Sequence, residues 1–261
     1  GVCGPTLLTQ TTSQVPLTGS TISCNNAGNT AENSYYRAYA STGFPAGFNV
    51  CAVELTIESA LAGTGTTQPM TINVYRQSGG VFPAGTQTLV GTAAVQVGNG
   101  DLTSLSVPVT AAIPAGEDLV VEALIPDGVA ATNRLFLGSN AAGQTGASFL
   151  RAPSCGASAP TALATLGFPN VHMILNARGS TGSPAVIGLT PPTVDFGNVV
   201  AGSTSAVLSA TITNTGGSPL TITAIATPTA PFTQTANTCI GTPVVGGGTC
   251  TVSYRFAPTA A

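Results

Sequence analysis

The stretch that decides the fold class is Cys51-Ala-Val-Glu-Leu-Thr-Ile-Glu58, in which larger apolar residues occupy every second position. Successive side chains of a β-strand point to opposite faces of its sheet, so this period of two predicts a strand that is buried on one side only. Helical periodicity is missing from almost all of the chain. The same alternation recurs in segments 70–74, 105–109, 119–125 and 171–175.

Turn signals separate these alternating segments. Asn99-Gly100 lies between two of them and predicts a tight hairpin, because Asn-Gly tolerates the positive φ angles that such turns need. The tripeptide Pro-Ala-Gly occurs at 45–47, 83–85 and 114–116, each time beside a strand-like run, and is typical of a chain reversal. Many short strands joined by glycine and proline turns predict an all-β, jelly-roll-like β-sandwich over residues 1–178.

A second β domain is expected after a linker. Residues 179–186 are small, polar and flexible, as linkers are. Beyond them alternation returns: Leu208, Ala210 and Ile212 share one face of a predicted strand, and the intervening residues are Ser and Thr. We therefore divide the chain into domains at 1–178 and 187–261.

The composition excludes several classes of function. Only 6 % of the residues are charged, against about 25 % in a typical soluble domain. The six basic residues are all arginine and the net charge is −3, so there is no basic surface for nucleic acid. A mean hydropathy of +0.37 argues against disorder. No apolar run reaches the roughly 18 residues of a membrane span, so none is predicted.

The six cysteines predict disulfides. They cannot form the usual zinc sets, since no C-x-x-C pair occurs and the chain has one histidine. Cys239 and Cys250 flank a turn-rich stretch and are expected to pair. The other four allow three connectivities, among which we favour Cys24–Cys155 with Cys3–Cys51. Disulfides indicate an oxidising compartment. The expected location is extracellular or at the cell surface, with a signal peptide already removed.

The second domain carries a family likeness. Val194-Asp-Phe-Gly197, the turn Thr213-Asn-Thr-Gly216 and the strand Cys250-Thr-Val252 lie within residues 187–258. In this combination the segment resembles the bacterial choice-of-anchor D repeat, which is related to the ASPM/SPD-2/hydin modules. The resemblance implies an immunoglobulin-like sandwich in extracellular, surface-attached proteins, with no catalytic residues. Residues 1–178 more faintly resemble uncharacterised β-rich modules of bacterial surface proteins, in segments 33–38, 137–144 and 167–172.

One departure from that family suggests a function. Two further strands follow the corresponding segment in the family, so residues 187–261 are expected to form an immunoglobulin-like domain that lacks its last strands. Either the chain is a fragment, or another chain completes the sheet by strand donation. Residues 1–18 are a candidate donor, and an equally weighted alternative makes them the first strand of their own domain. The apolar and β-branched donor residues would be Thr6, Leu7, Leu8, Val15 and Leu17.

The first hypothesis is therefore a structural protein that assembles with itself head to tail into a surface filament. The alternative is a carbohydrate-binding or adhesive module of a longer anchored protein. Sugar-binding sites often stack rings on aromatics, and the candidates are Tyr35 and Tyr36. On a strand these two tyrosines would face opposite ways, and packing in the core is the favoured interpretation for both.

Catalytic chemistry has little support in the sequence, and we predict no enzyme, no cofactor and no metal site. His172 has no G-x-S-x-G nucleophile to serve. Glu54 and Glu58 would lie about 13 Å apart on one strand face, too far for glycoside hydrolysis. Turn aspartates that could bind calcium lack the spacing of a calcium loop. They are Asp101, Asp118 and Asp127.

Overall fold

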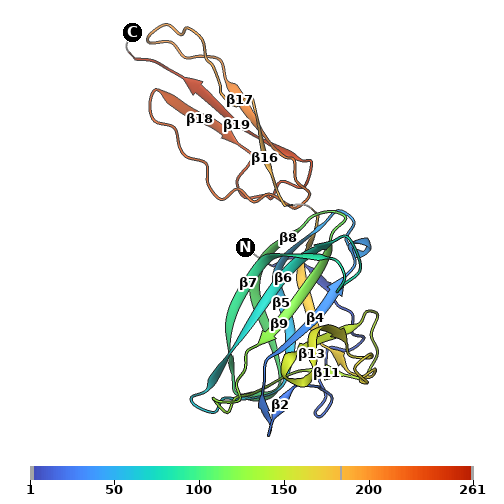
Figure 1. Cartoon of the computed structure of the whole chain (residues 1–261). Helices are drawn as coiled ribbons and strands as arrows, with labels where there is room; N and C mark the ends of the chain where they lie inside the picture. The colour runs from blue at the N-terminus through green and yellow to red at the C-terminus, as the bar shows by residue number, and fades with distance from the viewer. Residues whose placement is uncertain (1–2, 183, 260–261) are drawn as a thin grey trace. The chain divides into compact units, whose positions relative to one another are not determined.

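The computed structural model describes residues 3–182 and 184–259, whose regular secondary structure is almost entirely β-strand (Figure 1). The chain divides into two compact units, Gly1–Thr181 and Gly182–Ala261. The all-β prediction is confirmed.

Unit 1 is built from two antiparallel sheets. The six-stranded sheet has the order β13 (Ala157–Ala162), β12 (Ser148–Ala152), β4 (Asn33–Tyr39), β9 (Asp118–Ile125), β6 (Thr67–Ser78), β7 (Thr86–Gly98). The five-stranded sheet contains β1 (Thr6–Leu8), β15 (Leu175–Thr181), β5 (Phe48–Leu61), β10 (Arg134–Leu137) and β8 (Gly100–Ile113). Two short pairs complete the unit: β2 (Asn25–Asn26) with β3 (Asn29–Thr30), and β11 (Ser139–Asn140) with β14 (His172–Met173).

The core of unit 1 follows the predicted alternation. Val53, Leu55 and Ile57 on β5 are each at most 2 % exposed, and they belong to one apolar cluster with residues of the six-stranded sheet such as Ile72 and Val121. Burying such side chains contributes about 1.5–3 kcal/mol each to folding. The two sheets therefore pack face to face as a β-sandwich, with the apolar half of each strand between them.

The chain does turn at Asn99, but the tight hairpin expected there is wrong, because this turn connects the two sheets. β7 ends at Gly98 in one sheet and β8 begins at Gly100 in the other, so the two strands leave the turn into different layers. Gly100 has φ +157°, which is unfavourable for a residue with a Cβ. The Asn99 side chain also accepts a hydrogen bond from the Ala62 amide.

The predicted linker begins later than expected. β15 continues to Thr181, and Gly179 pairs with Thr6 of β1 on one side and Val50 of β5 on the other. A Cβ at Gly179 would collide with the backbone of Asn49, so glycine serves here for close strand packing. Backbone pairing needs no apolar side chains, which is why a polar segment can still be strand.

Unit 2 contains one regular sheet, with the order β16 (Ile187–Thr190), β17 (Leu208–Asn214), β19 (Thr249–Phe256), β18 (Phe232–Asn237). Its second layer is irregular and is held by two isolated bridges, Leu220 with Val244 and Ile222 with Ile240. Few apolar side chains are fully buried in the described part of this unit. They are Ala210, Cys239, Val244, Cys250 and Val252.

Candidate functional site

Three disulfides link the six cysteines as the sequence analysis favoured. Cys3 is bonded to Cys51, Cys24 to Cys155, and Cys239 to Cys250. The first two lie within unit 1 and the third within unit 2. Each therefore cross-links a single unit, and Cys24–Cys155 closes a loop with a sequence separation of 131 residues.

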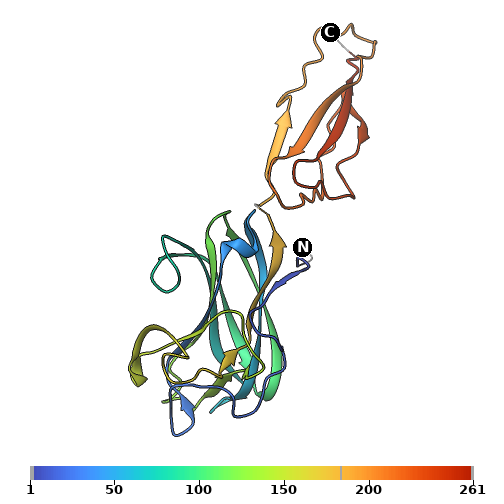
Figure 2. The same ribbon diagram turned by 90° about the vertical axis from the view of Figure 1, so that its right-hand side faces the viewer.

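The candidate donor strand is not free in this structure. Thr6, Leu7 and Leu8 form β1, which pairs antiparallel with β15 at the edge of the sheet of its own unit (Figure 2). The Cys3–Cys51 disulfide fixes the chain to β5 just before β1 begins. The expectation that these residues complete another subunit is corrected accordingly: β1 satisfies the open edge of its own sheet, and a covalent bond keeps it there.

Val15 and Leu17 belong to a segment that we call the N-terminal strap, residues 9–21. Their side chains are 65 % and 50 % exposed, but the strap backbone is bound to unit 1. The Leu17 amide donates to the Ser139 carbonyl at 2.9 Å. Both carboxylate oxygens of Glu58 accept backbone N–H groups of the strap, at 2.8 and 2.9 Å. The strap thus covers part of the outer face of the five-stranded sheet.

Tyr35 and Tyr36 offer no exposed ring for sugar stacking. Tyr35 is fully buried and its hydroxyl donates to the Ile22 carbonyl, while Tyr36 is 8 % exposed. β4 lies inside the six-stranded sheet, so Tyr35 enters the core and Tyr36 packs on the other face against Phe82, with ring centroids 5.4 Å apart. Their burial confirms the favoured interpretation that both rings pack within the unit, and the alternative that they bind a glycan is wrong.

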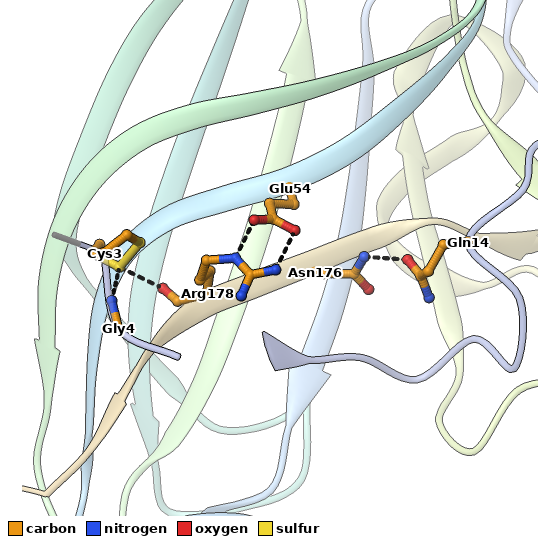
Figure 3. Close-up of polar contacts among 7 residues, drawn as sticks. Cys3, Gly4, Gln14, Glu54, Asn176 and Arg178 are labelled. Carbon is orange, nitrogen blue, oxygen red and sulfur yellow. Dashed lines mark hydrogen bonds and ion pairs between the residues drawn. A yellow bond between two sulfur atoms is a disulfide. The ribbon is translucent and has the colours of Figure 1, made fainter. Parts of the chain in front are cut away.

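The other candidates each have a structural partner. Glu54 is ion-paired with Arg178 across β5 and β15, whereas Glu58 anchors the strap, so the two glutamates do not act together (Figure 3). His172 is 7 % exposed, and its Nδ1 accepts a hydrogen bond from the Gly143 amide at 3.0 Å. Among the described residues no group of three or more His, Cys, Asp or Glu side chains is placed to hold a metal ion.

Each of the three turn aspartates has a different environment. Asp118 accepts a hydrogen bond from the Ser41 amide, and Asp127 accepts one from the Val129 amide. Asp101 is exposed on β8 and lines a hollow on the surface of unit 1.

A hollowed surface of unit 1 runs along the outer face of β5 and β8. Three hollows of about 500, 260 and 320 Å³ follow one another along these strands. We call them together the β5–β8 groove. From one end to the other the groove-lining positions of β5 and β8 include Cys51, Ala52, Glu54, Thr56, Glu58, Ser59, Thr110, Pro108, Ser106, Ser104 and Asp101.

The strand register places polar side chains side by side in the middle of this groove. Glu54 is paired with Asn176 of β15 on one side and with Ser106 of β8 on the other. Figure 3 shows Asn176 donating to the side-chain oxygen of Gln14 in the strap, at 2.5 Å, beside the Glu54–Arg178 ion pair. A carboxylate, two amides and a serine thus line one short stretch of surface.

This groove was missed by sequence reasoning. Alternation alone places Glu54 and Thr56 on the outer face of their strand. The neighbours of Glu54 and Thr56 follow from the pairing of β5 with β8 and β15, which brings in partner residues 48 or more positions away along the chain. The available signal was Ser104 and Ser106, on the solvent side of the strand predicted from Leu105 to Val109.

Unit 2 presents a different feature, an apolar surface around its sheet. Phe196, Phe232 and Phe256 form an aromatic cluster with centroids 4.9–6.1 Å apart, and Phe232 is 42 % exposed. On the opposite edge strand, Ile187 and Leu189 are 61 % and 45 % exposed. Within the described residues, neither β16 nor β18 has a second partner strand.

Comparison of the chain with models of known families, with curated proteins and with solved structures gave no match. Over the part of the chain that the structure describes, no helix is long and apolar enough to cross a membrane.

Proposed function

We propose that this chain is an extracellular structural protein whose copies assemble head to tail into a filament through unit 2. The observation that carries the proposal is the half-covered sheet of unit 2. Its two edge strands bear exposed apolar residues, and its second layer is irregular.

The apolar exposure supports an association surface. Monomeric proteins rarely leave several large apolar residues exposed around one small sheet, and such surfaces mark interaction sites. Ile187 and Phe232 lie on opposite edges of the sheet, and each retains more than two fifths of its accessible surface. Burial against another chain would remove this area from water, at about 25 cal/mol per Å².

The charge of unit 2 supports a second copy of the chain as the partner. Residues 182–261 contain one acidic and one basic residue, Asp195 and Arg255, so the unit has no net charge. Copies of one unit that carry a net charge repel each other, whereas a net charge near zero promotes association. Nothing in this charge pattern selects a charged partner of another kind.

The two edges support an open assembly. β16 and β18 differ in sequence and lie on opposite sides of the sheet, so a contact between β16 of one copy and β18 of the next joins unlike surfaces. Such heterologous contacts form rings if they close and filaments if they do not. The strap and β1 are held within their own unit, so this proposal assigns the contact to unit 2 and not to residues 1–18.

The disulfides support the extracellular part of the proposal. All six cysteines are paired, and structural disulfides persist mainly in oxidising compartments. The chain has no lysine, and many threonines lie on exposed strand faces. Hydroxyl groups therefore supply much of the polar surface of the protein.

Electron microscopy and sedimentation of the intact chain test the proposal. We expect fibres or large oligomers from the unaltered protein, and their loss in Phe232→Asp and in Ile187→Asp. Ile187 lies outside the aromatic cluster, so its substitution tests the surface without disturbing that packing. Val81→Asp, at a position 82 % exposed in unit 1, is the matched control and should assemble normally.

A sedimentation profile showing only monomers at high protein concentration would overturn the proposal. Assembly that persists in both unit 2 variants would also overturn it.

A further inference from the structure

We propose that the β5–β8 groove of unit 1 is a binding site for an uncharged glycan chain that lies along β5. This site is separate from the assembly surface on unit 2 and does not depend on it. Its shape, its chemistry and the hydrogen bonds that its residues leave unmade all fit such a ligand.

The shape fits an extended ligand. The groove follows β5 from Cys51 to Ser59, which at about 3.3 Å per residue is about 26 Å. Its first two hollows share Ser106, and the third continues along the same two strands. Compact ligands bind in single cavities of about 300–1,000 Å³. Three shallow hollows in a line suit a chain of repeating units better.

The chemistry fits a ligand rich in hydroxyl groups. Ser104, Ser106 and Gln14 line the middle hollow, and each can both donate and accept a hydrogen bond, as a sugar hydroxyl does. Glu54 adds carboxylate oxygens that accept hydroxyl donors. Because Arg178 donates to both of these oxygens, the carboxylate is held in place and its charge is balanced within the protein.

Unmade hydrogen bonds gather at the same groove. Five buried side-chain polar atoms in the described residues have no partner, and three of them belong to groove-lining residues. These are Thr56 Oγ1, Asn176 Oδ1 and Arg134 Nε. Each such atom costs about 1–3 kcal/mol. Small side-chain rotations toward a bound polyhydroxylated chain would give these groups partners.

An aromatic ring lies at one end of the groove. Leu135 and Leu137 of β10 are fully buried, so the intervening Phe136 faces outward, where it lines the third hollow with Arg134 and Asp101. One face of a sugar ring carries C–H groups, and hydroxyl groups surround it. The Phe136 ring could contact the C–H groups while the polar side chains around it contact the hydroxyls. This phenylalanine would take the stacking role for which Tyr35 and Tyr36 were the candidates in the sequence.

Two other ligand classes fit less well. An extended polypeptide binds a sheet through the free backbone groups of an edge strand. The groove lies on a sheet face, where the backbone of β5 is already paired with β15, β10 and β8. An anionic polymer needs free cations. In the described structure Arg134 is the only groove arginine without an ion pair, and the carboxylates of Glu58 and Asp101 line the same hollow, which disfavours an anion there.

The test uses the intact chain on an array of neutral and acidic oligosaccharides, followed by titration calorimetry with the strongest neutral binder. Ser106→Trp places a large side chain in the middle of the groove at an exposed position of β8. We expect it to weaken binding at least tenfold, and Phe136→Ala to weaken it several-fold. The matched control is Thr88→Trp, on the exposed face of β7 in the other sheet, which should bind normally.

Unchanged thermal unfolding of Ser106→Trp shows that the loss is local. An array without a neutral binder overturns the proposal, and so does binding only to acidic glycans or affinity that Ser106→Trp does not change. Assembly distinguishes this proposal from the first: Ser106→Trp should still form fibres, and Phe232→Asp should still bind the glycan.

Discussion

The hydroxyl of Tyr36 on β4 donates a hydrogen bond of 2.7 Å to Oε1 of Glu122 on the neighbouring strand β9. The other carboxylate oxygen accepts hydrogen bonds from Tyr75 at 2.6 Å and from Asn73 at 2.9 Å. Burial by itself raises the pKa of Glu122, but the donors Tyr75, Asn73 and Tyr36 together outweigh it and lower the pKa below its usual value. Burial, with Glu122 beside them, raises the pKa of both tyrosines.

This carboxylate makes unit 1 sensitive to acid. In the unfolded chain Glu122 takes up a proton near its ordinary pKa of about 4.3, whereas in the folded chain it does so only at lower pH. Its contribution to stability is therefore complete above the unfolded pKa and is lost as the pH falls through the folded pKa. Urea unfolding between pH 7 and pH 3 should show this loss, and Glu122→Gln should reduce the dependence on pH.

Removal of one donor should weaken the cluster at neutral pH. Tyr75→Phe deletes a hydrogen bond to a charged group, which contributes about 1.5–3 kcal/mol to the free energy of unfolding. Tyr254→Phe is the control, since no hydrogen bond is formed by that hydroxyl in the described structure, and it should cost little. Equal effects of the two changes in urea unfolding at pH 7 would contradict this account of the cluster.

The disulfides Cys24–Cys155 and Cys239–Cys250, which close loops of very different length, should contribute differently to the free energy of unfolding. In the chain-entropy model, closing the long loop between Cys24 and Cys155 stabilises by about 5 kcal/mol, and closing the short loop between Cys239 and Cys250 by about 3 kcal/mol. Paired Cys→Ser variants should therefore lower the midpoint of denaturant unfolding of unit 1 more than that of unit 2. Mass spectrometry of peptides from the unreduced protein checks that the other bridges remain intact.

Asn214 should be essential to the packing of unit 2. Its fully buried amide donates to the carbonyls of Ser218 and Val244 and accepts hydrogen bonds from the amides of Gly216 and Val186. Asn214→Ala leaves these buried backbone groups without partners, which costs about 1–3 kcal/mol for each group that water cannot reach.

Hydrogen exchange followed by mass spectrometry should show faster exchange in segments 184–190 and 216–220 of the Asn214→Ala variant. Ser209→Ala, at an exposed position of the same strand, is the control and should leave exchange in both segments unchanged.

Glu58 should hold the strap in place. Glu58→Ala removes the acceptors of the Gly19 and Thr21 amides, so these amides should exchange faster and the strap should become more sensitive to proteases. Glu32→Ala breaks a surface ion pair with Arg151 in which both side chains are about one third or more exposed. Such pairs contribute little, so the control should behave as the unaltered protein does.

Alternation correctly predicted the burial of residues whose position depends only on the period of their own strand. Val53, Leu55 and Ile57 are buried because a strand puts every second side chain on one face. Asn99-Gly100 separates two strands, as its turn residues indicate, but these strands lie in different sheets and do not form the expected hairpin. The preferred cysteine pairing agreed with the structure, but by choice among three connectivities and not by deduction.

Arg37 shows where local reasoning fails. An arginine is usually exposed, yet this one is fully buried on the core side of β4. Its guanidinium donates to the carbonyls of Met173 and Gly146 and to the side chain of Gln144, and burial lowers its pKa to about 10. Those acceptors are more than 100 residues away along the chain, so no window of sequence could identify them.

The sequence by itself determined that this protein is all-β and where its two units divide to within a few residues. These properties follow from the periodicity of apolar residues and from turn residues, which are patterns among residues close together in the chain. Only the tertiary structure decided that β1 closes its own sheet, that Tyr36 is buried, and that Glu54, Asn176 and Ser106 share a groove. Strand pairing joins residues far apart in the chain, and a shift of register by one residue would turn every one of these side chains to the opposite face.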